Sequence, residues 1–523
     1  MKNVLGSLVP VLILAALSCS KSSDDTSGAA GNSPGGSSAG SGGATSSSSA
    51  GGSALGGAAS GSAGSGATAG GSVVATGGGS SGGASTAGAG GNTSSAGAAG
   101  SVSGNAGAAG NTSGSAGAAG SLSGSAGAAG GGTLPSACNG SVHSTGSAGS
   151  AQPSVALTVP TGFTLTTIAK VTGARELAAL PNGDLLIATS GGSIYLLPNA
   201  DASTAVGSPA VFGTVTDTPA QGIAFDPSTC KVYVGSQKNL YSLAYTDAQK
   251  TGSFGTAIAS VRTGSISPNR PAGDTDNHTT TSVAVASGVL YAGVGSSCNA
   301  CVETDATRAS IQRFDLNGAN GATRATRFRN AIALTANPAT GTLWAGGAGQ
   351  DNLPANHPYE FFDAVGLHSG VADYGWPACE ENHVAYTSGA ACADTVQPLI
   401  ELPAYSTIIG AAFYPATQAG AYAFPATYKG GLFLTAHGSW HKDTGGALVS
   451  KPQVVYVPMN GDAPKTAVDW SDPTKQWTTF VGGFQLADGA TRLARPTGIA
   501  VGALGSLLIA DDQSGYIFRV RPN

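Results

Sequence analysis

Residues 276–301 contain the residues with the clearest chemical potential in this 523-residue chain, DNHTTTSVAVASGVLYAGVGSSCNAC. His278 stands among small polar residues, and Cys298 and Cys301 follow it in C-x-x-C spacing. The pair has four readings: a metal site, a haem attachment, a redox dithiol, or a disulfide that braces a loop beside a catalytic histidine. The rest of the chain has to distinguish them.

The neighbouring residues favour the braced loop. Val302 follows Cys301, so the C-x-x-C-H pattern of covalent haem attachment is absent. The chain has no second C-x-x-C, which disfavours structural zinc. A thioredoxin-type dithiol starts a helix in a βαβ unit, whereas this pair follows a predicted β-hairpin. We therefore expect a short disulfide.

The cysteine count extends this expectation. The chain has seven cysteines, and six remain when Cys19 is set aside. An even number in an exported chain indicates disulfides, although many connectivities are formally possible. The simplest choice joins the local pairs first and therefore predicts Cys298–Cys301, Cys379–Cys392 and Cys138–Cys230.

The first residues predict export. Residues 1–18 have a lysine near the start, an apolar run and small residues before Cys19, as a bacterial signal peptide does. The apolar run is too short for a transmembrane helix. Cys19 resembles the lipidated cysteine of a lipoprotein, with Ala16 where Leu is preferred; cleavage after Ser18 without lipidation is the alternative. Ser20 favours the outer membrane, so we expect an exported, lipid-anchored protein at the cell surface or the periplasmic side.

Residues 19–135 predict a disordered tether. They are almost entirely Gly, Ser, Ala and Thr, with tandem units such as SVSGNAGAAG at 101–110. Such a segment buries too little apolar surface to offset its backbone entropy. As a random coil it would span on the order of 60 Å. A fibrous Gly-Ala-Ser packing is the alternative.

Residues 136–523 predict one folded, all-β domain. A strand–turn–strand pattern recurs, with Gly, Asn, Asp and Pro at the turns. Its copies lie at 176–197, 222–243, 282–295, 332–347, 410–440 and 498–520. Such a repeat predicts a six-bladed β-propeller, in which residues 162–171 complete the last sheet. A β-sandwich or a parallel β-helix is the alternative. The long connections 348–409 and 441–497 are expected to be functional loops on one face.

Several segments resemble one family, the glucose/sorbosone dehydrogenases, which include fungal pyranose dehydrogenases. The matching stretches include RASIQRFDLNG (308–318), RFRNAIAL (327–334), DYGWP (373–377), FPATYKGGLFLTAHGSWHK (424–442) and RPTGIAVGALGSLLIADD (495–512), together with the His278 segment. The resemblance implies a six-bladed propeller that oxidises sugars with pyrroloquinoline quinone (PQQ), often with calcium.

The resemblance also implies how the cofactor is held. PQQ carries three carboxylates, which favour arginine with its planar, bidentate fork. Arg329 and Asn330 match the family's Arg-Asn pair, and Arg495 matches the arginine that opens the last blade. Weaker candidates are Arg175, Arg492 and Lys442. The alternative for each arginine is a surface salt bridge.

His278 matches the family's catalytic base. Alcohol oxidation needs a group that takes the hydroxyl proton, and a neutral imidazole suits that task. Asp276 is expected to orient the ring. A loop histidine satisfied by its neighbours is the alternative.

Two residues of the AHGSWHK segment are further cofactor candidates. His437 falls where the family lines the cofactor cavity. Trp440 either stacks on the quinone or packs between blades, and His441 is expected to be exposed.

Calcium is expected at residues 347–354, where the family supplies backbone carbonyls. Gly349, Gln350 and Asp351 are the candidate ligands, because calcium prefers oxygen. The sequence departs here from the family's Gly-Pro turn, and Asp351 could cap a turn instead.

The partners follow from these expectations. The chain has no haem motif, so electrons would pass from the sugar to an external cytochrome or quinone. The membrane is reached through the lipid anchor only. A net charge of −5 without a basic patch disfavours nucleic acid.

Two other functions remain open: a non-catalytic surface propeller that binds glycans or proteins, and a metal-dependent lactonase. The latter needs acidic and Asn ligands in the central channel, and the sequence does not suggest such a set.

Overall fold

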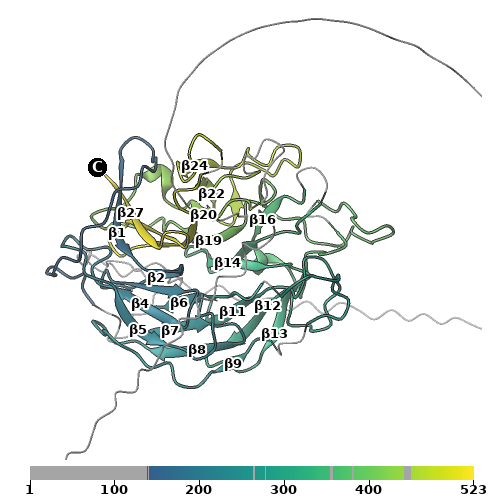
Figure 1. Ribbon diagram of the computed structural model, residues 1–523, viewed down its shortest axis with the longest axis horizontal. Coiled ribbons are helices and arrows are strands. Elements are labelled where there is room, and N and C mark those ends of the chain that lie inside the picture. Colours follow the sequence, from purple (N-terminus) through teal and green to yellow (C-terminus); the bar gives the residue numbers. More distant parts are fainter. Residues whose placement is uncertain are drawn as a thin grey trace, which may run out of the picture. The chain divides into compact units, whose positions relative to one another are not determined.

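The computed structural model describes Cys138 and residues 140–262, 266–276, 278–353, 357–379, 382–440, 449–489 and 491–523 (Figure 1). The predicted signal peptide, Cys19 and the predicted tether lie outside these residues. The described elements are β-strands and two single-turn 3-10 helices, η2 (Val365–Leu367) and η3 (Ala426–Tyr428). Neither helix of the described residues has the length or hydropathy of a membrane span.

The strands form six sheets around a common centre, which confirms the predicted six-bladed propeller. Sheet 1 comprises β2 (Ala174–Ala179), β3 (Leu185–Thr189), β4 (Ser193–Leu197) and β5 (Ala210–Thr214). Sheet 2 comprises β6 (Gly222–Asp226), β7 (Lys231–Gly235), β8 (Asn239–Ala244) and β9 (Ala259–Ser260). Sheet 3 comprises β10 (Thr281–Ala286), β11 (Val289–Val294), β12 (Ser310–Asp315), β13 (Ala322–Thr326) and β17 (Ala372–Asp373). Sheet 4 comprises β14 (Ala331–Ala336), β15 (Leu343–Gly347), β16 (Glu360–Asp363) and β18 (Ile400–Leu402). Sheet 5 comprises β19 (Ile408–Phe413), β20 (Leu432–Ala436), β21 (Gln453–Val457) and β24 (Thr478–Val481). Sheet 6 comprises β25 (Pro496–Val501), β26 (Leu507–Asp511), β27 (Tyr516–Pro522) and β1 (Phe163–Lys170). A small hairpin, β22 (Met459–Asn460) with β23 (Ala463–Pro464), stands apart.

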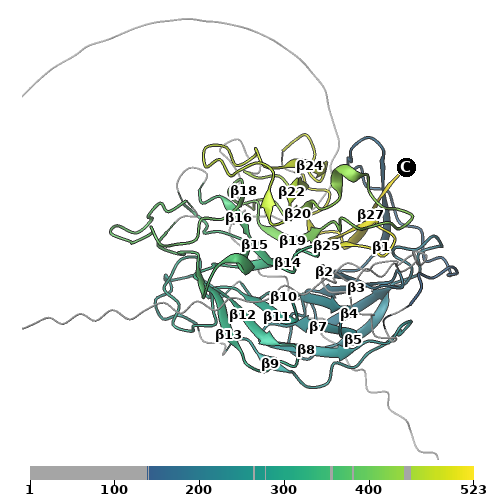
Figure 2. The same cartoon turned by 180° about the vertical axis from the view of Figure 1, so that it is seen from behind.

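The ring closes between the two ends of the domain. β1 pairs antiparallel with β27, from Phe163 opposite Pro522 to Lys170 opposite Tyr516. The two strands lie side by side in both views (Figure 1 and Figure 2). This is the closure expected for residues 162–171. It gives sheet 6 its fourth strand, as sheets 1, 2, 4 and 5 each have.

Apolar side chains between neighbouring sheets hold the ring together. All five residues of β3, β15, β20 and β26 are buried, because each of these strands is covered on both faces. Aromatic rings fill the region where the ring closes: Phe163 of β1 lies 4.7 Å from Phe424 and 5.2 Å from Phe480 between ring centroids.

The innermost strands β2, β6, β10, β14, β19 and β25 each contact the next around the centre. Their starts gather on one side, which we call the strand-start face. Thr280, just before β10, donates to Gln221, just before β6, and Thr497 at the start of β25 donates to Ala174 O at the start of β2. The turns that follow these strands lie on the opposite, strand-end face. A cavity of about 370 Å³ there is lined by residues of all six innermost strands.

Four of the innermost strands have an irregular register at their start. The pairing shifts between Ala174 and Leu177 in β2, and likewise at the beginning of β14, β19 and β25. Bulges of this kind change the direction of side chains and are common beside active sites. The strand-start face is therefore where the fold presents its irregular, polar positions.

Candidate active site

His278 lies just before β10 and is half-buried on the strand-start face. Its Nδ1 is 3.1 Å from Ser296 O and 2.8 Å from Ser296 Oγ. Arg262 Nη1 donates to the His278 carbonyl at 3.1 Å and so holds the backbone of this loop. A carbonyl oxygen can only accept a hydrogen bond, so the contact with Ser296 O places the proton on Nδ1 and leaves Nε2 as the acceptor.

Ser296, not Asp276, orients the imidazole, so the expectation for Asp276 was wrong. Both Asp276 carboxylate oxygens accept bonds from Arg308, at 2.9 and 2.7 Å. This bidentate pair is more favourable for a carboxylate than a single bond to a neutral ring.

The environment keeps His278 neutral. Burial lowers its pKa to about 3, and the positive charge of Arg329 acts in the same direction, while Asp351 opposes it. An imidazole that is neutral across the physiological range, with Nε2 as its acceptor, can take a proton from a substrate hydroxyl.

Arg329 and Asn330 lie immediately before β14, beside His278. Arg329 is buried and forms an ion pair with Asp351 at 2.8 Å, which excludes the surface salt bridge as an alternative. Asn330 Oδ1 is buried and has no hydrogen-bond partner among the described residues. A Cβ at Gly295 would lie 2.4 Å from His278 Cβ and 2.7 Å from Asn330 Oδ1, so only glycine allows these side chains to approach.

A second group comes from blades 5, 6 and 1. Asp512 accepts from Arg175 Nη1 at 2.8 Å and from His437 Nε2 at 3.0 Å. Arg495 Nε and Nη2 donate to the carbonyls of His437 and Gly438, at 3.2 and 2.9 Å. Four residues that are distant in sequence are thereby joined on the strand-start face, with Arg175, His437 and Arg495 all buried.

The charges in this second group are unequal. Burial lowers the pKa of His437 to about 4, assisted by Arg495 and opposed by Asp512. Burial alone would raise the pKa of Asp512, but His437, Arg175 and Arg495 hold it below its usual range. Asp512 is therefore ionised beside a neutral His437 that donates from Nε2. The two arginines carry one charge more than Asp512 neutralises.

This excess positive charge fits an anionic ligand. Arg175 Nε and Nη2 are buried and have no hydrogen-bond partner among the described residues. An unpaired buried donor is costly, so such groups mark a place where a ligand completes the bonding. The two Arg175 donors fit the carboxylate acceptors of a planar carboxylated cofactor, and Asn330 Oδ1 fits a donor on it.

The remaining cofactor candidates are more peripheral. Trp440 is 39% exposed, and quinone stacking or packing between blades both stay predictions for it. Arg492 contacts the carbonyl of Ser439, next to Trp440. Lys442 and His441 lie outside the described residues.

Of the expected calcium ligands, Gly349 and Gln350 line a cavity of about 40 Å³ beside Arg329. Gln350 Oε1 is buried without a partner among the described residues, and Glu360 Oε2 accepts from Gly349 N at 2.7 Å. Burial raises the pKa of Glu360 to about 8. The unpaired amide oxygen and buried carboxyl fit a hard cation. The carboxylate of Asp351, in contrast, is engaged by Arg329.

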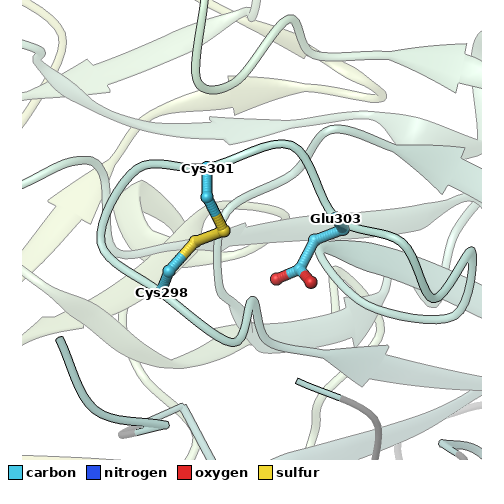
Figure 3. Close-up of side chains that lie close together, drawn as sticks. All are labelled: Cys298, Cys301 and Glu303. Atoms are coloured by element: carbon cyan, nitrogen blue, oxygen red, sulfur yellow. A yellow bond between two sulfur atoms is a disulfide. The ribbon is translucent and has the colours of Figure 1, made fainter. Parts of the chain in front are cut away.

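The structure contains the three expected disulfides, Cys138–Cys230, Cys298–Cys301 and Cys379–Cys392. Cys298, Cys301 and Glu303 are the only His, Cys, Asp or Glu group at metal-binding spacing within the described ranges. The two sulfur atoms are bonded to each other in Figure 3, so this group is a braced loop.

Comparisons with known proteins agree with the fold. The family described as TrAA12-like matches residues 157–383. That match covers less than half of the chain. A relative from Borreliella burgdorferi, described as an uncharacterized protein, is 24% identical over 197 residues, which are 37% of this chain and 46% of that protein. The chain therefore matches only about half the length of that relative.

Solved structures share the propeller fold. The holo form of the pyranose dehydrogenase PQQ domain from Coprinopsis cinerea superposes with a TM-score of 0.56 at 21% identity, covering 71% of this chain and 98% of that one. A Trichoderma reesei protein of Carbohydrate-Active Enzymes Family AA12, in an iodide structure, gives 0.57 at 18% identity, covering 72% and 100%. The resemblance predicted from the sequence is confirmed, and at these identities the structures show the fold.

Several residues of the candidate site were not predicted from the sequence. They are Arg262, Ser296, Asn299, Arg308, Glu360 and Asp512. Arg308 and Asp512 stand inside segments that matched the family, at 308–318 and 495–512. The charged residues of those segments were the available signal.

Proposed function

We propose that this protein oxidises a hydroxyl group of a sugar or polyol, with PQQ as the oxidant and His278 as the base. The observation that carries the proposal is the presence on one face of a neutral, oriented imidazole and of two buried Arg175 donors that have no partner among the described residues. The names of the similar solved structures, a pyranose dehydrogenase PQQ domain among them, support the same class.

The chain's own residues define what each part of the reaction requires. His278 Nε2 accepts the hydroxyl proton, while Ser296 holds the ring through Nδ1. PQQ, when bound, supplies a two-electron oxidant that accepts the hydride from the carbon. One O–H and one C–H bond break, and a C=O bond forms. Arg175, Arg329 and Arg495 would hold the cofactor's carboxylates, and Asn330 its ring.

Calcium is proposed as a second cofactor. Gln350, Glu360 and Gly349 would hold it, and its charge would compensate the buried Glu360 carboxylate. A Trichoderma reesei AA12 protein of the same fold is described as a calcium structure, with a TM-score of 0.55 at 18% identity.

We further propose that the domain is displayed from a lipid anchor at Cys19, and that the chain joins the propeller on the face opposite the active site. Support comes from where the residues after the tether join the propeller. Cys138 is bonded to Cys230 in the turn after β6, and His143 N donates to Asn182 O in the turn after β2. Both turns lie on the strand-end face. An external cytochrome or quinone could then reach the strand-start face.

The test is a titration of the purified apoprotein with PQQ and calcium, followed by dye reduction with a panel of aldoses and polyols. We expect PQQ-dependent dye reduction, and a loss of about 10²-fold or more in kcat for His278→Ala with PQQ binding retained. Failure of the folded protein to bind PQQ at micromolar concentration, with calcium present, would refute the proposal.

A further inference from the structure

Asn299 occupies an unusual position in the middle of the disulfide-closed loop. The bond between Cys298 and Cys301 closes a ring that includes Asn299 and Ala300, shown in Figure 3. Trp376 packs against this disulfide, together with Ala309. The ring is thus part of the packed structure on the His278 blade, although Asn299 itself is only half-buried.

Asn299 uses all four of its polar groups. Its amide N donates to Asp274 Oδ2 at 2.7 Å. Its carbonyl accepts from Arg329 Nε and from Trp376 Nε1, both at 3.1 Å. Its side-chain Oδ1 accepts from Arg329 Nη2 at 2.9 Å and from Asp351 N at 2.8 Å, and Nδ2 donates to Asp351 O at 3.0 Å.

Asn299 therefore sets the direction of the Arg329 guanidinium. Arg329 donates two hydrogen bonds to this one residue, from Nε and from Nη2, and they fix the plane of the guanidinium group. Arg329 also forms an ion pair with Asp351. The Asn299 side chain is hydrogen-bonded to the backbone N and O of Asp351, so it positions this partner as well. A long, flexible side chain loses much of its rotamer freedom here before any ligand binds.

The disulfide ring is also connected to His278, through Ser296. Ser296 Oγ donates to Cys298 O at 2.6 Å and lies 2.8 Å from His278 Nδ1. On the other side, Glu303 accepts from the N and Oγ of Ser297 and fixes the start of the loop. The disulfide ring is therefore connected to both the imidazole and the cation, which belong to neighbouring blades.

Loop length indicates what this disulfide is for. Its cysteines are three residues apart, whereas Cys138 and Cys230 are 92 apart. The stability that a disulfide adds through the unfolded chain grows with the length of the loop. Cys298–Cys301 thus contributes less to global stability than Cys138–Cys230, and its main effect is local rigidity around Asn299.

We infer that Asn299, held rigid by the Cys298–Cys301 ring, is a positioning residue that preorganises Arg329 for an anionic cofactor and connects it to His278. The inference rests on the proposed function for the identity of the ligand. Its structural part, the restraint of Arg329, is independent of that ligand.

The test uses two changes to the ring and one matched control, all in the whole protein. Asn299→Ala removes the side-chain contacts and keeps the disulfide. The pair Cys298→Ser with Cys301→Ser opens the ring and keeps Asn299. The control pair, Cys138→Ser with Cys230→Ser, opens the larger loop on the opposite face. Thermal unfolding of each variant shows that it is folded.

The first readout needs no cofactor. Phenylglyoxal modifies accessible arginines, and peptide mapping reports the rate at each position. We expect Arg329 of the apoprotein to react about tenfold faster in both ring variants than in the wild type, a ratio typical of losing one charge-assisted bond. Arg175, equally buried in the other group, keeps its rate, as does Arg329 in the control pair. An unchanged rate at Arg329 in both ring variants would overturn the inference.

The second readout separates cofactor binding from turnover. Asn299→Ala should raise the Kd for PQQ about tenfold and leave kcat at saturating PQQ close to that of the wild type. The cysteine-to-serine ring variant should raise Kd and also lower kcat, because Ser296 and His278 depend on Cys298. The control pair lowers the unfolding temperature and leaves Kd unchanged. If the wild type itself does not bind PQQ, the proposed function fails, and the Arg329 rates still decide the positioning role.

Discussion

His278 is the proposed base, and burial keeps its ring neutral. Its pKa is lowered to about 3, first by loss of water and then by Arg329. Ser296 fixes the ring through Nδ1, so Nε2 is the only nitrogen left to accept a proton. One ring nitrogen, Nδ1, therefore fixes the orientation of the imidazole, and the other, Nε2, takes up the proton.

The pH dependence of turnover follows from that pKa. We expect the acid limb of kcat/KM near pH 3, far below the ordinary histidine value of about 6.5, because the ring protonates only there. The measurement is dye reduction over about five pH units with a pH-insensitive dye. The residual activity of His278→Ala should lack this limb. A limb between about pH 6 and 7 would show a solvated imidazole and contradict the assignment.

Asp512 has the opposite role, since it compensates buried positive charge. It binds both Arg175 and His437, and only 17% of its side chain is exposed. We expect Asp512→Asn to lower the free energy of unfolding by roughly 3 kcal/mol, because Arg175 loses its counter-ion. Chemical denaturation measures this change.

Adding PQQ should recover part of that loss, since an anionic ligand replaces the missing charge. Asp394→Asn, at an exposed turn position of the same residue type, is the control and should be nearly neutral. Equal stability of Asp512→Asn and the wild type would show that Arg175 has other compensation.

At the scale of elements, the starts of the innermost strands place the site. The register shifts at the beginning of β2 and β25 lie beside Arg175 and Arg495, and the shift in β14 follows Asn330. A regular strand would alternate its side chains strictly, so the bulges allow consecutive polar residues to face the same region.

Gly295, which follows β11, leaves the space that the His278 side chain occupies. Gly295→Ala would place a Cβ 2.4 Å from His278 Cβ, so the histidine loop has to move. We expect a loss of about 1–3 kcal/mol in stability and a fall in kcat larger than any change in the Kd for PQQ.

Gly191→Ala is the matched control, since a Cβ there meets only one atom, at 3.7 Å. Unfolding curves and steady-state kinetics on both variants check the prediction. A normal kcat for Gly295→Ala would mean that the loop tolerates the displacement.

At the scale of the whole molecule, buried ionisable groups set the dependence of stability on pH. Burial raises the pKa of Glu176 and Glu360 to about 8, so the folded state binds more protons than the unfolded chain above pH 4.5. Stability contributed by these groups is lost as pH rises from 4.5 through 8. His278 and His437 have lowered pKa values, so their effect is a loss of stability as pH falls below 6.5.

The two effects together predict greatest stability of the apoprotein between pH 4.5 and 6.5, where they oppose each other. Thermal unfolding across pH measures this maximum. Glu360→Gln should flatten the alkaline side, because the variant has no carboxyl to ionise there. A maximum above pH 8 in the wild type would contradict the raised pKa values.

The repeat of strands, and with it the six-bladed ring, could be read from the sequence. Alternating apolar residues and Gly-rich turns are local signals, and closure by residues 162–171 follows from counting strands. The disulfides followed from the short spacing of two cysteine pairs. Arg329, Asn330, Arg495, His437 and His278 were recognisable because they stand in segments that resemble a family.

The connections between those residues were decided by the tertiary structure alone. Asp512 meets Arg175 across 337 residues of sequence, and Asn299 meets Arg329 across 30, because the ring brings distant strand starts to one face. Asp276 binds Arg308 rather than His278 for the same reason: a local pattern shows which groups are near in sequence, whereas a carboxylate pairs with the best donor in space. Residue types that could perform the chemistry were therefore determined by the sequence, and their partners, protonation and orientation by the packing of the blades.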